Sequence, residues 1–151
     1  MRLLRIIPGW LLVALLAAPA SAAPARILKV LPQFLDLEGR HALSPSLYDR
    51  DAYQAELRAH PEKVSGIRFA TQWNTKKETA FTLRIELRGI RHGETTRAAI
   101  EESVRHHGLF SSWANPALTG DAYKKFGTLT AWRATLWDGE DLVAEQKSFL
   151  W

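Results

Sequence analysis

The sequence predicts a mainly β fold: an antiparallel β-sandwich with one short peripheral helix at about residues 46–60. Three observations support this prediction. Short segments in which apolar and polar residues alternate recur along residues 65–151. Turn residues separate these segments at intervals of about eight to twelve positions, as in all-β sandwiches. The pair Asp138-Gly139 stands between the last two segments, and Asp-Gly between β-rich runs is a strong hairpin signal.

The chain begins with a predicted secretory signal peptide, residues 1–22. Arg2 and Arg5 precede a short apolar run, and the small residues of 19–22 end it with a cleavage site. A membrane-spanning helix needs about 20 apolar residues, which this run does not reach. We therefore expect a periplasmic or secreted protein with no stable membrane insertion after cleavage. The alternative, a segment retained as an anchor, is left open by the sequence.

Cleavage leaves residues 23–151, which we expect to form one domain. Its predicted parts are an N-terminal edge strand and helix, 23–63, packed on a β-sandwich core, 64–151. The 20 Lys and Arg residues fall to 18 without Arg2 and Arg5, against 16 Asp and Glu. This near-balance argues against a nucleic-acid partner. Because the chain has no cysteine, stability must come from buried apolar surface rather than from disulfides.

The N-terminal part of the domain predicts an edge strand followed by the helix. Pro32 interrupts the β-rich segment 25–37, and proline in a strand indicates an edge or a bulge. The apolar alternation also changes face along this segment, which predicts a strand that kinks and switches sheets. In the helix, Ser46 and Asp49 are alternative N-cap candidates and Pro61 is a stop signal.

The following segments predict the body of the sandwich. Residues 67–73 alternate, and residues 80–88 alternate more regularly, with four apolar side chains on one face. Residues 95–105 fit a strand or a helix, and the flanking strands favour a strand. Residues 119–127 predict one helical turn that ends at a glycine.

The segments 128–137 and 142–151 predict the terminal hairpin. We expect its last residues, Phe149 to Trp151, to lie in the core and close the bottom of the sandwich. Burial there predicts that deleting these three residues unfolds the domain.

The order of the predicted elements resembles that of bacterial exported immunoglobulin-like or fibronectin-type-III-like domains. These elements are a proline-containing edge strand, central strands, the GDAYKKFG turn at 120–127 and a terminal hairpin. The resemblance covers about residues 64–151 and is one of pattern. It implies an immunoglobulin-like β-sandwich that acts as a binding or scaffolding module.

Aromatic residues are the candidate ligand-binding groups. Phe110 and Trp113 lie in an irregular segment, and Trp137 ends a predicted strand. Exposed together, these three side chains would form an aromatic platform for sugar rings. The competing interpretation is that the tryptophans belong to the core, Trp132 above all.

No metal or catalytic site is predicted. His106 and His107 are adjacent, so on a strand they point to opposite faces and do not hold one ion together. An acid–base site could be formed by Asp36, Glu38 and His41. However, carboxylates in such a segment are usually solvated rather than catalytic. No serine-hydrolase elbow, zinc-protease helix or phosphate-binding loop occurs.

The sequence thus predicts an exported, non-enzymatic binding or structural module of the bacterial cell envelope, without cofactors. Its expected partner is a protein or a glycan of the envelope. Two alternatives stay open: a carbohydrate-binding module that uses exposed tryptophans, and a metal-dependent hydrolase.

Overall fold

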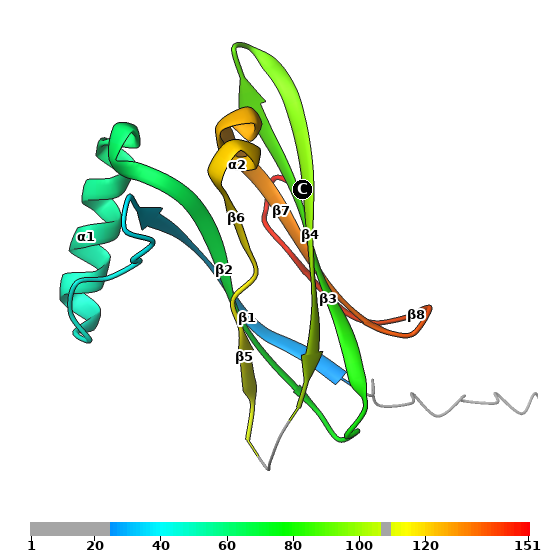
Figure 1. Ribbon diagram of the computed structural model, residues 1–151. Coiled ribbons are helices and arrows are strands. Elements are labelled where there is room, and N and C mark those ends of the chain that lie inside the picture. Colours follow the sequence, from blue (N-terminus) through cyan, green and yellow to red (C-terminus); the bar gives the residue numbers. More distant parts are fainter. Residues whose placement is uncertain (1–24, 107–109) are drawn as a thin grey trace, which may run out of the picture.

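The computed structural model describes residues 25–106 and 110–151, so the predicted signal peptide and His107 lie outside the described residues. Two antiparallel sheets and two α-helices make up the described part (Figure 1), which confirms the mainly β, sandwich-like fold. In chain order the elements are β1 (Ala25–Asp36), α1 (Leu47–Ala59), the 3-10 turn η1 (Pro61–Lys63), β2 (Val64–Thr75), β3 (Ala80–Arg91), β4 (Glu94–Arg105), β5 (Ser112–Ala114), β6 (Ala117–Thr119), α2 (Gly120–Phe126), β7 (Thr128–Asp138) and β8 (Asp141–Lys147).

The strands divide between sheet A and sheet B. Sheet A has the order β1-β2-β5, and β6 also pairs with β2. Sheet B has the order β4-β3-β7-β8. Every strand pair is antiparallel. Strand β5 lies in the segment around Trp113 that was expected to be irregular. Both β5 and β6 are only three residues long, which is too short for a clear alternation of apolar and polar residues. The immunoglobulin-like type of the sandwich stays a prediction.

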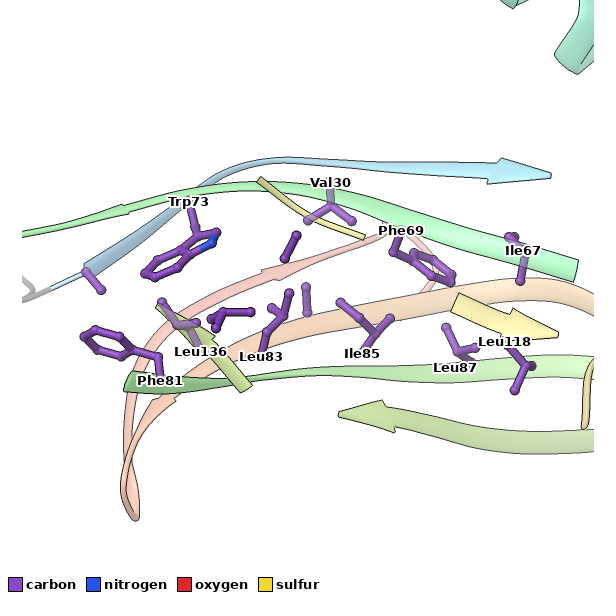
Figure 2. Close-up of a cluster of buried hydrophobic side chains, with 14 of the residues drawn as sticks. Val30, Ile67, Phe69, Trp73, Phe81, Leu83, Ile85, Leu87, Leu118 and Leu136 are labelled. Atoms are coloured by element: carbon purple, nitrogen blue, oxygen red, sulfur yellow. The ribbon is translucent and has the colours of Figure 1, made fainter. Parts of the chain in front are cut away.

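The space between the sheets holds the apolar core (Figure 2). Alternation along β3 puts four side chains on the inner face, each at most 1% exposed. Side chains of β2 meet them from sheet A, and the Trp73 and Phe81 rings pack edge to face with centroids 5.7 Å apart. The inner residues of β2 and β3 are Ile67, Phe69, Trp73, Phe81, Leu83, Ile85 and Leu87.

Strand β1 does not switch sheets, and that prediction was wrong. It pairs with β2 along its whole length and forms an edge of sheet A, as its proline indicated. The register shifts between Ile27 and Lys29, where a bulge leaves Leu28 half exposed. Beyond it, Val30 faces the core between the sheets, whereas Leu35 is buried outside that core. The change of apolar face arises because α1 packs on β1 near its end (Figure 1).

Residues 95–105 form a strand, as the flanking sequence favoured. All twelve residues of β4 pair with β3, from Glu94 opposite Arg91 to Arg105 opposite Ala80. Ile100 and Val104 lie on the inner face of the strand, opposite Ile85 and Phe81.

The last residues of the chain are not in the core, which corrects the prediction for Phe149 to Trp151. Strand β8 ends at Lys147, and Ser148 makes one further backbone bond, from its N–H to the Trp132 carbonyl, at 2.9 Å. Phe149 is fully exposed and Leu150 is 71% exposed. The Trp151 ring instead packs on two arginines, Arg88 and Arg133.

Deleting Phe149–Trp151 should therefore leave a folded, cooperatively unfolding domain. The expected cost is about 1 kcal/mol, from loss of the stacking of Trp151 on arginine. Urea unfolding followed by circular dichroism measures this. A non-cooperative transition, or a loss above about 3 kcal/mol, would restore the interpretation of a buried terminus.

Two polar side chains fasten α1 to β1. The Gln54 amide accepts from the Phe34 N–H at 2.8 Å and donates to the carbonyls of Phe34 and His41. It thus satisfies backbone groups at the edge of β1, as a neighbouring strand would. Of the two predicted N-cap candidates, Ser46 caps the helix, by accepting from the Asp49 N–H.

Asp36 is the second fastening point. Its carboxylate accepts from the backbone N–H groups of Glu38 and Arg40, from Arg40 Nε at 2.8 Å and from Tyr53 Oη at 2.7 Å. Burial alone would raise the pKa of Asp36, but the hydrogen bonds from Tyr53, Arg40 and Glu38 outweigh burial and lower this pKa to about 2.

Replacing Asp36 with Asn should cost about 1–2 kcal/mol of unfolding free energy at pH 7, after allowance for solvent screening. The folded-state pKa lies below the unfolded value of 3.8. The contribution of Asp36 is therefore complete above about pH 4 and is lost as the pH falls towards about 2. Urea unfolding at several pH values should show a smaller acid-induced loss in D36N than in the wild type. Equal losses in both proteins would contradict this role.

Candidate functional site

The three aromatic residues predicted to bind ligand lie on two different faces. Phe110 is 83% exposed and Trp113, in β5, is 50% exposed. Trp113 pairs with Gln72 of β2, so it points away from the core side, where Trp73 lies. Trp137 pairs with Thr82 of β3 on the outer face of sheet B. The structure therefore does not assemble Phe110, Trp113 and Trp137 into one platform.

The outer face of sheet B is the surface where aromatic and charged side chains gather. It consists of the positions of β3, β4, β7 and β8 that alternate with the core residues, together with Trp151. Its main residues are Thr82, Arg84, Glu86, Arg88, Arg97, Glu101, Arg133, Thr135, Trp137 and Trp151.

Trp137 lies at one end of this face. The Arg84 guanidinium carbon is 5.6 Å from the Trp137 ring centroid, and Arg84 Nε donates to Glu101 Oε1 at 2.6 Å. The indole Nε1–H donates to Thr135 Oγ1 at 2.9 Å, which fixes the ring against the sheet. An open groove of about 360 Å³ lies beside the ring, lined by Thr82, Arg84, Glu101, Trp137, Gly139 and Glu140.

Trp151 lies farther along the same face. The guanidinium carbons of Arg88 and Arg133 are 4.0 and 5.0 Å from its ring centroid, distances typical of cation–π contacts. Arg133 also binds Glu86, with Nε and Nη2 at 2.7 and 2.6 Å from Oε2. A groove of about 500 Å³ here is lined by Glu86, Leu87, Arg88, Arg97, Ala98, Ala99, Arg133 and Trp151.

Sequence reasoning missed Trp151 because it assigned this residue to the core. The alternation of Arg84, Glu86 and Arg88 with apolar residues did show that β3 has a charged outer face. No local pattern indicates that the chain turns at Ser148 and lays an indole over that face. Only the tertiary path of the terminus brings Trp137 and Trp151 onto one surface.

Residues considered for catalysis or metal binding do not converge in the part of the chain that the structure describes. Within it, no group of three or more His, Cys, Asp or Glu side chains could hold a metal ion. His106 is buried against the Trp73 ring, with Nδ1 3.0 Å from Ser112 Oγ. Asp36 is held as a carboxylate by Arg40 and Tyr53, and no hydrogen bond joins it to His41.

No helix within residues 25–106 and 110–151 is long and apolar enough to cross a membrane. Comparison of the chain with family models, with curated proteins and with solved structures found no match. The geometry of the outer face of sheet B is thus the main guide to function.

Proposed function

We propose that this protein is an exported, non-enzymatic binding module of the bacterial cell envelope, and that its ligand lies on the outer face of sheet B. The observation that supports this is the presence of two tryptophan rings, Trp137 and Trp151, beside arginines on one open sheet face. Export rests on the signal peptide predicted at residues 1–22.

A glycan is the ligand class that this surface fits best. Sugar rings have apolar faces and hydroxyl edges, so they stack on flat indoles while neighbouring charged groups bind their hydroxyls. From Thr82 at Trp137 to Arg88 at Trp151 is six residues of strand, roughly 20 Å at 3.3 Å per residue. That length suits an extended oligosaccharide rather than a single sugar.

The distribution of strands supports the scaffold part of the proposal. An immunoglobulin-type sandwich places its first two strands in one sheet and its third in the other, and the final hairpin joins the sheet of the third. Here β1 and β2 lie in sheet A, whereas β3 and the β7-β8 hairpin lie in sheet B. Domains of this architecture commonly present binding surfaces without catalysis.

Trp137→Ala should weaken binding to the best polysaccharide of a soluble panel by about tenfold or more, as expected for a tryptophan at the centre of an interface. Affinity electrophoresis and isothermal titration calorimetry measure this. Trp113→Ala, on the outer face of sheet A, is the matched control and should bind normally.

The exposure of Phe110 and Trp113 favours a second candidate surface, the edge of sheet A at β5. If Trp113→Ala loses binding while Trp137→Ala retains it, that edge is the site. If no neutral or acidic polysaccharide in the panel binds the wild type, the proposed glycan-binding function is wrong.

A further inference from the structure

Two arginines on the outer face of sheet B lack an acidic partner. Arg88 on β3 and Arg97 on β4 are directly opposite each other. Directly opposed side chains in an antiparallel pair have Cβ atoms about 4.5–5.5 Å apart, and like charges there destabilise the sheet. No carboxylate of the described residues lies within 4.0 Å of either side chain's nitrogens. Neither arginine of the pair therefore has an ion pair within the described residues, and Glu86, which lines the same groove, is bound to Arg133.

Two other arginines of the same face are compensated. Arg84 pairs with Glu101 at 2.6 Å, and Arg133 pairs with Glu86 at 2.6 Å and with Glu145 at 3.8 Å. Arg105, opposite Ala80 on the same face, also has no ion pair within the described residues, so what sets Arg88 and Arg97 apart is that their like charges are directly opposed. Both side chains line the groove of about 500 Å³ that contains Trp151.

Trp151 restrains one member of the pair. The Arg88 guanidinium carbon is 4.0 Å from the Trp151 ring centroid. When a guanidinium lies on an aromatic ring, the N–H groups along the guanidinium edge can still bind a ligand. The arginine side chain then loses less conformational freedom on binding than an unrestrained one. The groove thus presents the restrained donors of Arg88 together with two positive charges that no carboxylate in the described part of the chain pairs with.

We propose that the groove at Arg88, Arg97 and Trp151 binds an oxyanion, a carboxylate or a phosphate, carried by an acidic polysaccharide. This inference rests on the proposed function and names its ligand class. Arginine binds both oxyanions in a bidentate manner. A polymer fits better than a free ion because the groove is open and a second open groove lies beside Trp137 on the same face.

The test compares the wild type with the double variant Arg88→Gln/Arg97→Gln by isothermal titration calorimetry and affinity electrophoresis. Polygalacturonate supplies carboxylates, a glycerol-phosphate polymer supplies phosphates, and dextran is the neutral probe. The double variant should bind the preferred acidic polymer at least about tenfold more weakly, because two charge-assisted contacts are lost. Arg26→Gln/Arg58→Gln removes the same charge from exposed positions on β1 and α1, away from the outer face of sheet B, and should change affinity less than about twofold.

A charge reversal separates ligand binding from folding. Arg97→Glu would place a carboxylate opposite Arg88, so it should raise the melting temperature while abolishing binding to the acidic polymer. A stabilised variant that still binds with wild-type affinity would overturn the inference.

The remaining outcomes are equally decisive. Dextran binding as strong as acidic-polymer binding would leave the proposed function in place and overturn the oxyanion site. Equal weakening by the groove variant and by the control variant would show that only net charge matters, and would also overturn it. Failure of all three polymers to bind would count against both proposals.

Discussion

Replacing Trp73 with Ala should cost about 3–5 kcal/mol of unfolding free energy, the range for removing a large buried aromatic side chain. Trp73 is 1% exposed and lies between the sheets (Figure 2), with its ring centroid 5.7 Å from that of Phe81 and 5.8 Å from that of His106. No smaller side chain at this position would fill the space between β2 and β3. The melting temperature should fall by about 10–20 °C.

Two variants make the Trp73 prediction specific. Trp73→Phe keeps an aromatic ring and removes the indole Nε1–H, which is buried and has no hydrogen-bond partner among the residues that the structure describes. Its cost should be less than half that of W73A, because the lost packing is partly offset by the removal of an unsatisfied donor. Trp113→Ala, a half-exposed residue of β5, should cost less than about 1 kcal/mol. Urea unfolding measures all three, and equal costs for W73A and W113A would show that the core lies elsewhere.

Gly127→Ala should cost about 3 kcal/mol or more. Gly127 ends α2 with φ of 84°, and a Cβ there would lie 2.5 Å from the Ile90 carbonyl oxygen and 2.8 Å from Arg91 Cβ. The positive φ alone costs an alanine about 1–2 kcal/mol. Relief of the clash would require the end of β3 to move away from the start of β7, because the obstacle at Ile90 is backbone.

Gly139 provides the matched control for Gly127. It also has a positive φ, 62°, in the β7-β8 turn, but a Cβ at this position would have no atom within 4 Å. Gly139→Ala should therefore show only the conformational cost of about 1–2 kcal/mol. Thermal unfolding of the two variants separates close packing from backbone conformation. If both lose the same stability, the packing of β3 against the end of α2 is looser than described.

The alternation of residues 80–88 predicted the central strand and its inner face because period-two burial is a local property of the sequence. The Asp-Gly hairpin and the glycine that ends α2 were likewise set by local chemistry. The position of Leu35 was not predictable in this way. An apolar residue on the outer face of a strand signals a covering element, but it does not tell a second sheet from a helix.

Local sequence patterns also could not predict the hydrogen bonds that hold α1 on β1, or the path of the last residues of the chain. Gln54 in a helix has no signature that separates a solvated amide from one that bonds the edge of β1. Phe149, Leu150 and Trp151 looked like core because apolar residues are usually buried, yet two of them are exposed and the third lies over arginines. The candidate surface includes Trp151 only because the last residues fold over sheet B. The sequence therefore indicated Trp137 as a candidate binding residue but not Trp151.

A two-dimensional ¹H–¹⁵N NMR titration of the tryptophan indole signals tests the central claim most directly: that ligand binds on the outer face of sheet B. Residues 25–151 contain five indoles, and single Trp→Phe variants assign their signals. On addition of the polysaccharide that binds most tightly, the signals of Trp137 and Trp151 should shift, while those of Trp73, Trp113 and Trp132 stay in place. Shifts confined to Trp113, or unchanged signals at both Trp137 and Trp151 under saturating ligand, would contradict the account.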